Sequence, residues 1–256
     1  MSNLAKIAPI VRGLLAEPTD NQDMPYKPVI LKSLTSKEAV DFAGSEKNAE
    51  AREYPEPLSK GQNPPLFLDT TDFDTEPENL RKQLSNRISD YSLKYKGNPE
   101  IICLCEMGIL YVDREVDVSD LPLRNKVALV TGAAGAIGYG ICCGLLENGC
   151  HLVATDLPGK KLDSFTTDLK QMAGDRVIGI PIDVTDEESV VRGLESVSLA
   201  WGGIDIVIVN AGIPLVSFLK LLLRPMPRKR RRLACPILYR VFFLLFRCKL
   251  LLLFFC

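Results

Sequence analysis

The chain has 256 residues, of which 46% are hydrophobic and 25% are charged, so it is long enough for one large domain or two small ones. The formal net charge is −1, so the chain as a whole is not expected to attract a polyanion such as nucleic acid. The eight Cys residues form no CxxC pair, and residues 1–16 contain no apolar core of secretory-signal length, so we expect reduced thiols in a cytoplasmic protein.

Residues 1–121 form a first region in which helical and strand-like patterns are mixed. Pro77 begins the clearest helix, because apolar side chains then recur at helical spacing up to Tyr95. The expected elements, in chain order, are a short helix broken by Pro9 within 1–17, a strand over 27–34, a helix over 36–49 capped by Ser36, a loop over 52–65, a helix over 77–96, short strands over 101–104 and 109–112, and an acidic linker over 113–120.

Residues 122–216 show a more regular alternation of short apolar runs with amphipathic segments. Strands are expected over 127–130, 151–156, 176–182 and 204–209, and the intervening segments are expected to be helices. The first helix should open at Gly138 and carry Ile137, Ile141 and Leu145 on one face, and the third should start from a capping box over 185–188. Four strands alternating with three helices predict an α/β fold: a partial Rossmann-type, doubly wound parallel sheet with strand order 3-2-1-4.

Two features of this alternation point to a ligand. Gly132 and Gly135 turn the chain between the first strand and its helix, where free backbone N–H groups and the helix dipole suit a pyrophosphate. Asp156 ends the second strand 24 residues after Gly132, where an acid can accept hydrogen bonds from ribose hydroxyls and repel a 2′-phosphate. An ordinary tight turn and a solvated Asp are the alternatives. Together the features favour NAD, with NADP less favoured although Lys160 and Lys161 are close by.

The order and intervals of these motifs resemble the coenzyme-binding half of a short-chain dehydrogenase/reductase. The resemblance implies that residues 131–138 cradle the pyrophosphate, that Asp156 with its neighbour holds the adenosine ribose, that two residues after the third strand contact adenine, and that three after the fourth line the nicotinamide side. The implied cofactor-binding residues are Thr131, Gly132, Gly135, Ala136, Ile137, Gly138, Asp156, Leu157, Asp183, Val184, Asn210, Ala211 and Gly212.

Two departures from that family stand out. Ala136 occupies a position beside the phosphates where the family usually has Gly, so we expect weaker binding. The family's catalytic Ser and Tyr-x-x-x-Lys are also missing: Ser217 comes too soon after Asn210, and Tyr239 is followed four residues later by Phe243. We therefore assign no catalytic residue and expect at most dinucleotide binding from the chain as written.

The last segment, residues 217–256, has a different composition. No acidic residue follows Asp205 while ten Lys and Arg do, so residues 1–205 carry a formal charge of −11 and the remainder +10. A membrane-spanning helix is disfavoured because no uncharged stretch exceeds seven residues. An interfacial basic helix is a second interpretation, and a nucleic-acid patch lacks a scaffold. We favour a third, that the tail is not native domain sequence but the product of a wrong frame or an unspliced transcript.

The first region is similar, in loosely matching segments, to the later part of a class II aldolase/adducin-type domain. The segments are 8–13, 40–42, 64–67 and 98–104, and such a domain precedes the dehydrogenase in bifunctional rhamnulose-phosphate aldolase proteins. Those aldolases hold a metal mainly with His side chains, whereas this chain has only His151, expected to be an exposed or satisfied strand residue. We therefore predict no metal site, and we interpret residues 1–121 as a remnant of such a domain with a structural role.

The sequence therefore predicts an NAD-dependent oxidoreductase by family, acting on a sugar-derived alcohol or aldehyde, and a coenzyme-binding fragment by its own residues. A non-catalytic NAD-binding or membrane-attached module is the alternative. The expected partners are a nicotinamide dinucleotide and, only in a complete form, a small-molecule substrate, with no nucleic acid.

Overall fold

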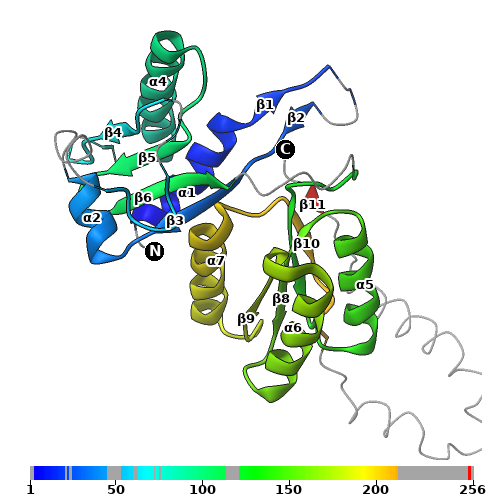
Figure 1. The fold of residues 1–256 in the computed structure, drawn as a ribbon. Helices are drawn as coiled ribbons and strands as arrows, with labels where there is room; N and C mark the ends of the chain where they lie inside the picture. Colours follow the sequence, from blue (N-terminus) through cyan, green and yellow to red (C-terminus); the bar gives the residue numbers. More distant parts are fainter. Residues whose placement is uncertain are drawn as a thin grey trace, which may run out of the picture.

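The computed structural model contains two larger sheets, each with helices on both faces (Figure 1), and a two-stranded antiparallel sheet of β1 (Glu17–Pro18) and β2 (Tyr26–Lys27). It describes residues 3–20, 22, 25–44, 53–59, 61, 63–71, 73–74, 76–113, 121–212 and 253–254. Most of the acidic linker predicted over 113–120, and the tail predicted over 217–256 apart from two residues, lie outside this part of the chain.

The second sheet confirms the predicted order of its four parallel strands. Its strands are β7 (Val127–Thr131), β8 (His151–Asp156), β9 (Val177–Pro181) and β10 (Ile206–Ile208). They lie in the order β9-β8-β7-β10, which is 3-2-1-4 in chain order, with Val127 opposite His151 and Val130 opposite Ile208. Parallel pairing places the carboxyl ends of all four strands at one edge of the sheet.

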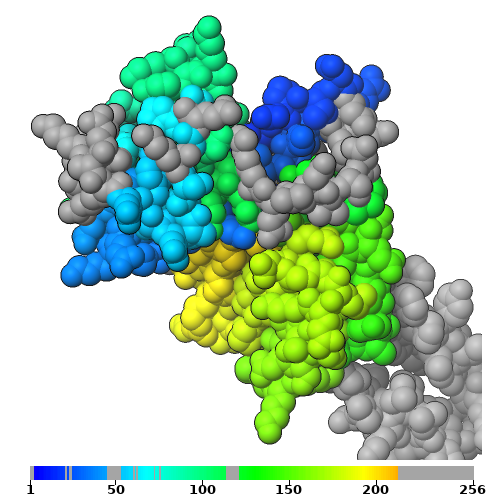
Figure 2. All heavy atoms as spheres, in the orientation of Figure 1, coloured from blue at the N-terminus to red at the C-terminus, as the bar shows by residue number. Residues whose placement is uncertain are grey.

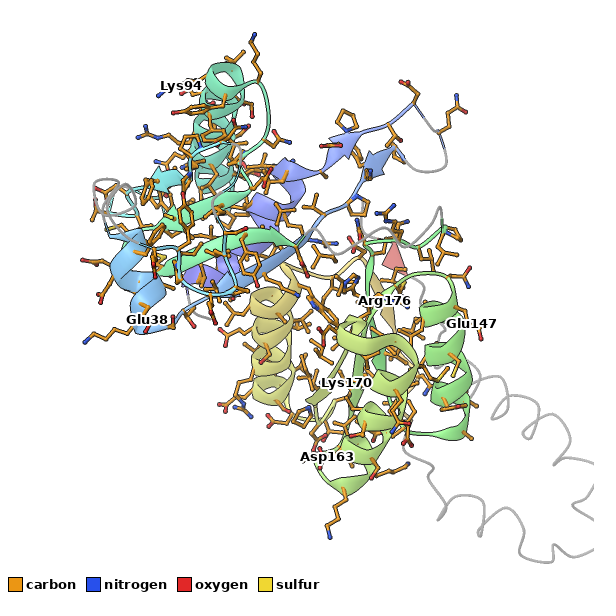
Figure 3. The ribbon with its side chains drawn as sticks, in the orientation of Figure 1. Glu38, Lys94, Glu147, Asp163, Lys170 and Arg176 are labelled. Atoms are coloured by element: carbon orange, nitrogen blue, oxygen red, sulfur yellow. The ribbon has the colours of Figure 1, made fainter. Side chains whose placement is uncertain are left out.

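Helices cover both faces of this sheet, as right-handed crossovers require. The helices α5 (Ala136–Glu147) and α6 (Lys160–Ala173) pack against Val130, Leu152 and Ala154 on one face. The helix α7 (Glu187–Trp201) packs against Leu129 and Val153 on the other. A 3₁₀ turn, η1 (Gly174–Arg176), precedes β9, and Arg176, labelled in Figure 3, donates hydrogen bonds to the carbonyls of Leu146 and Cys150.

Three local predictions for this half are wrong in detail. The helix α5 begins at Ala136 rather than Gly138, and it buries Gly138, Cys142 and Leu146 while Ile137 is 73% exposed. The sheet dictates which face points inward, and the small Gly138 allows the closest approach. The cap of α7 is Asp186, whose carboxylate accepts from the N–H of Glu188, whereas the Thr185 hydroxyl donates to Asp183 instead.

The edge strand β10 has a further partner on its outer side. The short strand β11 (Leu253–Phe254) pairs with it in the antiparallel sense, Phe254 opposite Ile206 and Leu253 opposite Val207. The sheet is thereby five-stranded, with one antiparallel member at the edge.

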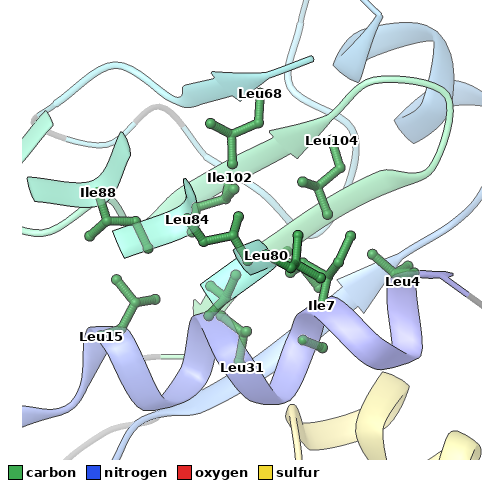
Figure 4. Close-up of a cluster of buried hydrophobic side chains, with 13 residues drawn as sticks. Leu4, Ile7, Leu15, Leu31, Leu68, Leu80, Leu84, Ile88, Ile102 and Leu104 are labelled. Carbon is green, nitrogen blue, oxygen red and sulfur yellow. The ribbon is translucent and has the colours of Figure 1, made fainter. Parts of the chain in front are cut away.

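The N-terminal region is built on a four-stranded mixed sheet of order β3-β6-β5-β4. On one face, α1 and α4 bury a cluster that includes Leu4, Ile7, Leu84 and Ile102 (Figure 4). On the other, Phe42 from α2 packs against the sheet. The elements are α1 (Asn3–Leu15), β1 (Glu17–Pro18), β2 (Tyr26–Lys27), β3 (Ile30–Leu34), α2 (Lys37–Ala43), β4 (Leu66–Leu68), α4 (Pro77–Tyr95), β5 (Ile101–Leu104) and β6 (Gly108–Asp113).

Sequence patterns located most of these elements but mistook their extents. The helix α1 continues through Pro9 rather than breaking there, because its buried face of Ile7, Ala8 and Val11 outweighs one lost backbone hydrogen bond. Ser36 caps α2 as predicted, accepting from the N–H of Ala39, and α2 ends at Ala43. Residues 45–49 of the predicted helix lie outside the described residues. The strand β4 was not predicted.

Arg12 of α1 joins the two regions. Its guanidinium donates to both carboxylate oxygens of Asp205, at 3.1 and 2.7 Å, and to the carbonyls of Val29 and Asn125. Asp205 in turn accepts from the N–H of Val127, at the start of β7. The helix α7 contacts both α1 and β3, so the two lobes of Figure 2 meet along α7 and the amino ends of the parallel strands.

Candidate functional site

The turn between β7 and α5 requires glycine at two positions. Gly132 has φ of +63°, and a Cβ there would lie 2.9 Å from the Cα of Ala211. A Cβ on Gly138 would overlap the carbonyl oxygens of Gly132 and Ala133. The turn is closed by a hydrogen bond from the N–H of Gly135 to the Gly132 carbonyl, 3.1 Å long. These constraints bring the first turn of α5 close to the end of β7.

Side chains at the ends of β7 and β10 hold the two strand ends together. The Thr131 hydroxyl accepts from the backbone N–H groups of Asn210 and Ala211, both at 3.0 Å. The Asn210 amide donates back to the carbonyls of Thr131 and Gly132. Residues separated by 79 positions in the sequence are thereby fixed beside the glycine turn.

Asp156, at the end of β8, faces the same turn. One carboxylate oxygen accepts from the N–H of Ala134 at 3.1 Å, and the other accepts from the N–H of Leu157 at 2.9 Å. The turn is further tied to β8 by the N–H of Ala133, which donates to the Thr155 carbonyl. The acid lies directly against the glycine turn, half-buried, with lone pairs left for a ligand.

Asp183 follows β9 and is held by its own turn. One of its oxygens accepts from both the hydroxyl and the N–H of Thr185. These hydrogen bonds lower the pKa of Asp183, and the bond from the Thr185 hydroxyl has the larger effect. The carboxylate is therefore charged at neutral pH.

These strand ends surround one hollow of about 620 Å³. Every predicted cofactor-binding residue lines it except Thr131 and Gly138, which shape the turn beneath. The lining residues are Gly132, Gly135, Ala136, Ile137, Asp156, Leu157, Lys161, Ile182, Asp183, Val184, Thr185, Asn210, Ala211 and Gly212. Three apolar side chains on this hollow are strongly exposed: Ile137 at 73%, Leu157 at 59% and Val184 at 45%.

Sequence analysis missed three residues of this lining, Lys161, Ile182 and Thr185. Ile182 and Thr185 flank predicted residues, so their proximity in sequence could have included them. The sequence showed Lys161 only as a residue close to Asp156. Because Lys161 lies five residues after Asp156, no local pattern indicates that the first turn of α6 reaches the hollow.

His151 is neither exposed nor fully hydrogen-bonded, contrary to expectation. It is only 5% exposed, its ring meets Trp201 edge to face, and its Nδ1 has no hydrogen-bond partner within the described structure. Burial, and then the positive charge of Arg176, lower the pKa of His151 to about 4. The imidazole is therefore neutral at physiological pH.

Free cysteines are present in the part of the chain that the structure describes. Cys103, Cys142 and Cys150 are buried free thiols, and burial raises the pKa of each to about 12. No three His, Cys, Asp or Glu side chains gather there in a metal-binding arrangement. No helix in those same residues has the length and apolar character needed to cross a membrane.

Comparison with known proteins matches residues 126–225 to the short chain dehydrogenase family, extending past the predicted boundary at residue 216. The uncharacterized oxidoreductase YuxG of Bacillus subtilis is 39% identical over 94 residues, covering 36% of this chain and 14% of that protein. The cyclohexanol dehydrogenase of a Rhodococcus species is 34% identical over 104 residues, covering 36% of this chain and 38% of that one. The chain thus spans less than two fifths of either relative.

A solved structure gives a further match over the same segment. L-sorbose reductase from Gluconobacter frateurii, in complex with NADPH and L-sorbose, is 35% identical and covers 37% of this chain and 36% of its own, with a TM-score of 0.35. The family match and the curated relatives show that residues 126–225 are similar in sequence to short-chain dehydrogenases.

Proposed function

We propose that the parallel-sheet half binds a nicotinamide dinucleotide and prefers NAD. The observation that carries the proposal is the position of Asp156, whose carboxylate meets the glycine turn through the N–H of Ala134 and lines the same hollow as Ala211 and Gly212. An acid and free backbone N–H groups around one hollow suit a ribose diol next to a pyrophosphate.

The other lining residues fit the parts of such a ligand. The backbone N–H groups of Ala136, Ile137 and Gly138, in the first turn of α5, would hold the pyrophosphate, and the Ala136 methyl group would crowd it slightly. The exposed apolar side chains of Leu157 and Val184 offer a slot for the flat adenine ring, with Asp183 beside it. Asn210, Ala211 and Gly212 would lie toward the nicotinamide.

We further propose that the complete form of this protein is a short-chain dehydrogenase-type oxidoreductase, acting in the cytoplasm on a sugar-derived alcohol or aldehyde. The dinucleotide supplies hydride transfer when bound, and the residues of this chain bind and orient it. The sugar-related substrate, and an aldolase-like origin of residues 1–121, rest on the resemblance of that region to bifunctional aldolase/dehydrogenase proteins.

Titration of the full chain with NADH and NADPH, wild type against Asp156→Ala, tests the cofactor assignment. We expect Asp156→Ala to weaken NADH binding more than NADPH binding, because the 2′-phosphate no longer faces a carboxylate. Asp163→Ala is the matched control, since this acid lies on α6 (Figure 3) and is not among the residues that line the hollow. Equal losses for both dinucleotides would refute the ribose assignment.

A further inference from the structure

Lys161 stands out among the residues around the hollow. It is the second residue of α6 and is exposed to solvent. Of the described residues that line the hollow, it alone is basic. Its ammonium group has no hydrogen-bond or ion-pair partner within the described structure, although Asp156 lines the same hollow. Its preceding neighbour, Lys160, is also exposed but does not line the hollow.

The two acids at the hollow are each engaged by their own surroundings. Both oxygens of Asp156 accept backbone N–H groups, from Ala134 and Leu157. Asp183 accepts two hydrogen bonds from Thr185. Because these donors offset part of each negative charge, the repulsion that Asp156 exerts on an anionic ligand group is reduced. Neither acid forms an ion pair with Lys161 in the described structure, so the positive charge of Lys161 is available to a ligand.

We infer that Lys161 is a specificity-determining residue that receives a phosphate on the adenosine ribose, so that the site accepts dinucleotides with a 2′-phosphate as well as those without. This inference rests on the proposed dinucleotide site. Asp156 sets the preference for NAD, and Lys161 limits how strong that preference becomes. A lysine suits this role because its long stem moves a compact point charge over several ångströms.

Matched substitutions in the full chain test the role of Lys161. NADH and NADPH are titrated against wild type, Lys161→Gln and Lys160→Gln by calorimetry at fixed low salt. We expect wild type to bind both, with NADPH weaker. Lys161→Gln should raise the Kd for NADPH about tenfold and change that for NADH less than about twofold, because only the 2′-phosphate loses a charged partner. Lys160→Gln should alter neither Kd more than about twofold.

The outcomes separate this inference from the proposal on which it rests. It is overturned, with dinucleotide binding intact, if wild type binds NADH but not NADPH, if Lys161→Gln weakens both equally or neither, or if Lys160→Gln matches its effect on NADPH. If wild type binds neither dinucleotide, both proposals fail together. Circular dichroism of each variant, expected to match wild type for these exposed side chains, confirms that the comparison is between folded proteins.

Discussion

The N-terminal region and the parallel-sheet half both bury apolar side chains on two faces of a sheet, but they differ in what their strand ends bring together. In the parallel sheet the four carboxyl ends share one edge, so Gly132, Asp156, Asp183 and Asn210 line one hollow. In the N-terminal sheet β5 and β6 form an antiparallel hairpin, which sends consecutive strand ends to opposite edges. Parallel pairing therefore brings residues from distant motifs together at one site, whereas the antiparallel hairpin of the N-terminal sheet separates its strand ends.

The largest effect should come from breaking the ion pair between the two regions. Arg12→Met leaves Asp205 without its cation and the carbonyls of Val29 and Asn125 without a donor. Since removing one partner of a buried pair costs about 3–5 kcal/mol, we expect urea denaturation to show a loss of that size in the free energy of unfolding. The Asp205 side chain is 27% exposed, so we expect a loss near the lower end of this range, about 3 kcal/mol.

Arg192→Met is the control for that experiment, because Arg192 pairs with Glu188 on the exposed surface of the parallel-sheet half. Its loss should cost less than about 0.5 kcal/mol. If Arg12→Met proves no more harmful than this control, the two regions are not joined energetically through Arg12.

A second substitution tests how tightly α5 must approach the end of β7. In Gly138→Ala the new methyl group would overlap the carbonyls of Gly132 and Ala133, so we expect a loss of about 3 kcal/mol and of NADH binding. Gly140→Ala, on the same helix with nothing near its Cβ, should instead stabilise by about 0.5–1 kcal/mol. Similar behaviour of the two variants in denaturation and titration would contradict this packing.

The pH dependence of stability tests the burial of His151 at the start of β8. Its pKa of about 4 lies below the unfolded value of 6.5, so the unfolded chain takes up the proton first as pH falls. Stability is therefore lost between pH 6.5 and 4, by about 2 kcal/mol at pH 5. His151→Phe keeps an aromatic ring against Trp201 but removes the titrating group. Between pH 7 and pH 5 this variant should therefore lose about 2 kcal/mol less of its free energy of unfolding than wild type does. An unchanged pH profile in urea would show that His151 is not buried as described.

The smallest effect concerns Ala136, which stands where the short-chain dehydrogenases that this sequence resembles usually have Gly. Ala136 is the first residue of α5 and is exposed toward the ligand site. Ala136→Gly should tighten NADH binding by about 1 kcal/mol or less, that is two- to fivefold in Kd, because the backbone can then come closer to the phosphates. Calorimetry showing equal or weaker binding would mean that the methyl group does not crowd the pyrophosphate.

Sequence analysis anticipated the parallel-sheet half well because its determinants are local. Apolar runs defined β7 and β8 to within one residue, and the residues that follow each strand needed only the rule that parallel strands end at one edge. It failed where tertiary packing decides: the inward face of α5, the continuation of α1 through Pro9, and β4, three residues long and paired with β5. Arg12 and Asp205, 193 residues apart, leave no local pattern at all.

An NMR titration of the full chain with NAD at millimolar concentration tests the central claim most directly. We predict saturable shifts in the amide resonances of Gly132, Ala134, Ala136 and Leu157, with those of β5 in the N-terminal region unchanged. Shifts that do not saturate, or that spread equally over both regions, would contradict a dinucleotide site formed by the glycine turn and Asp156.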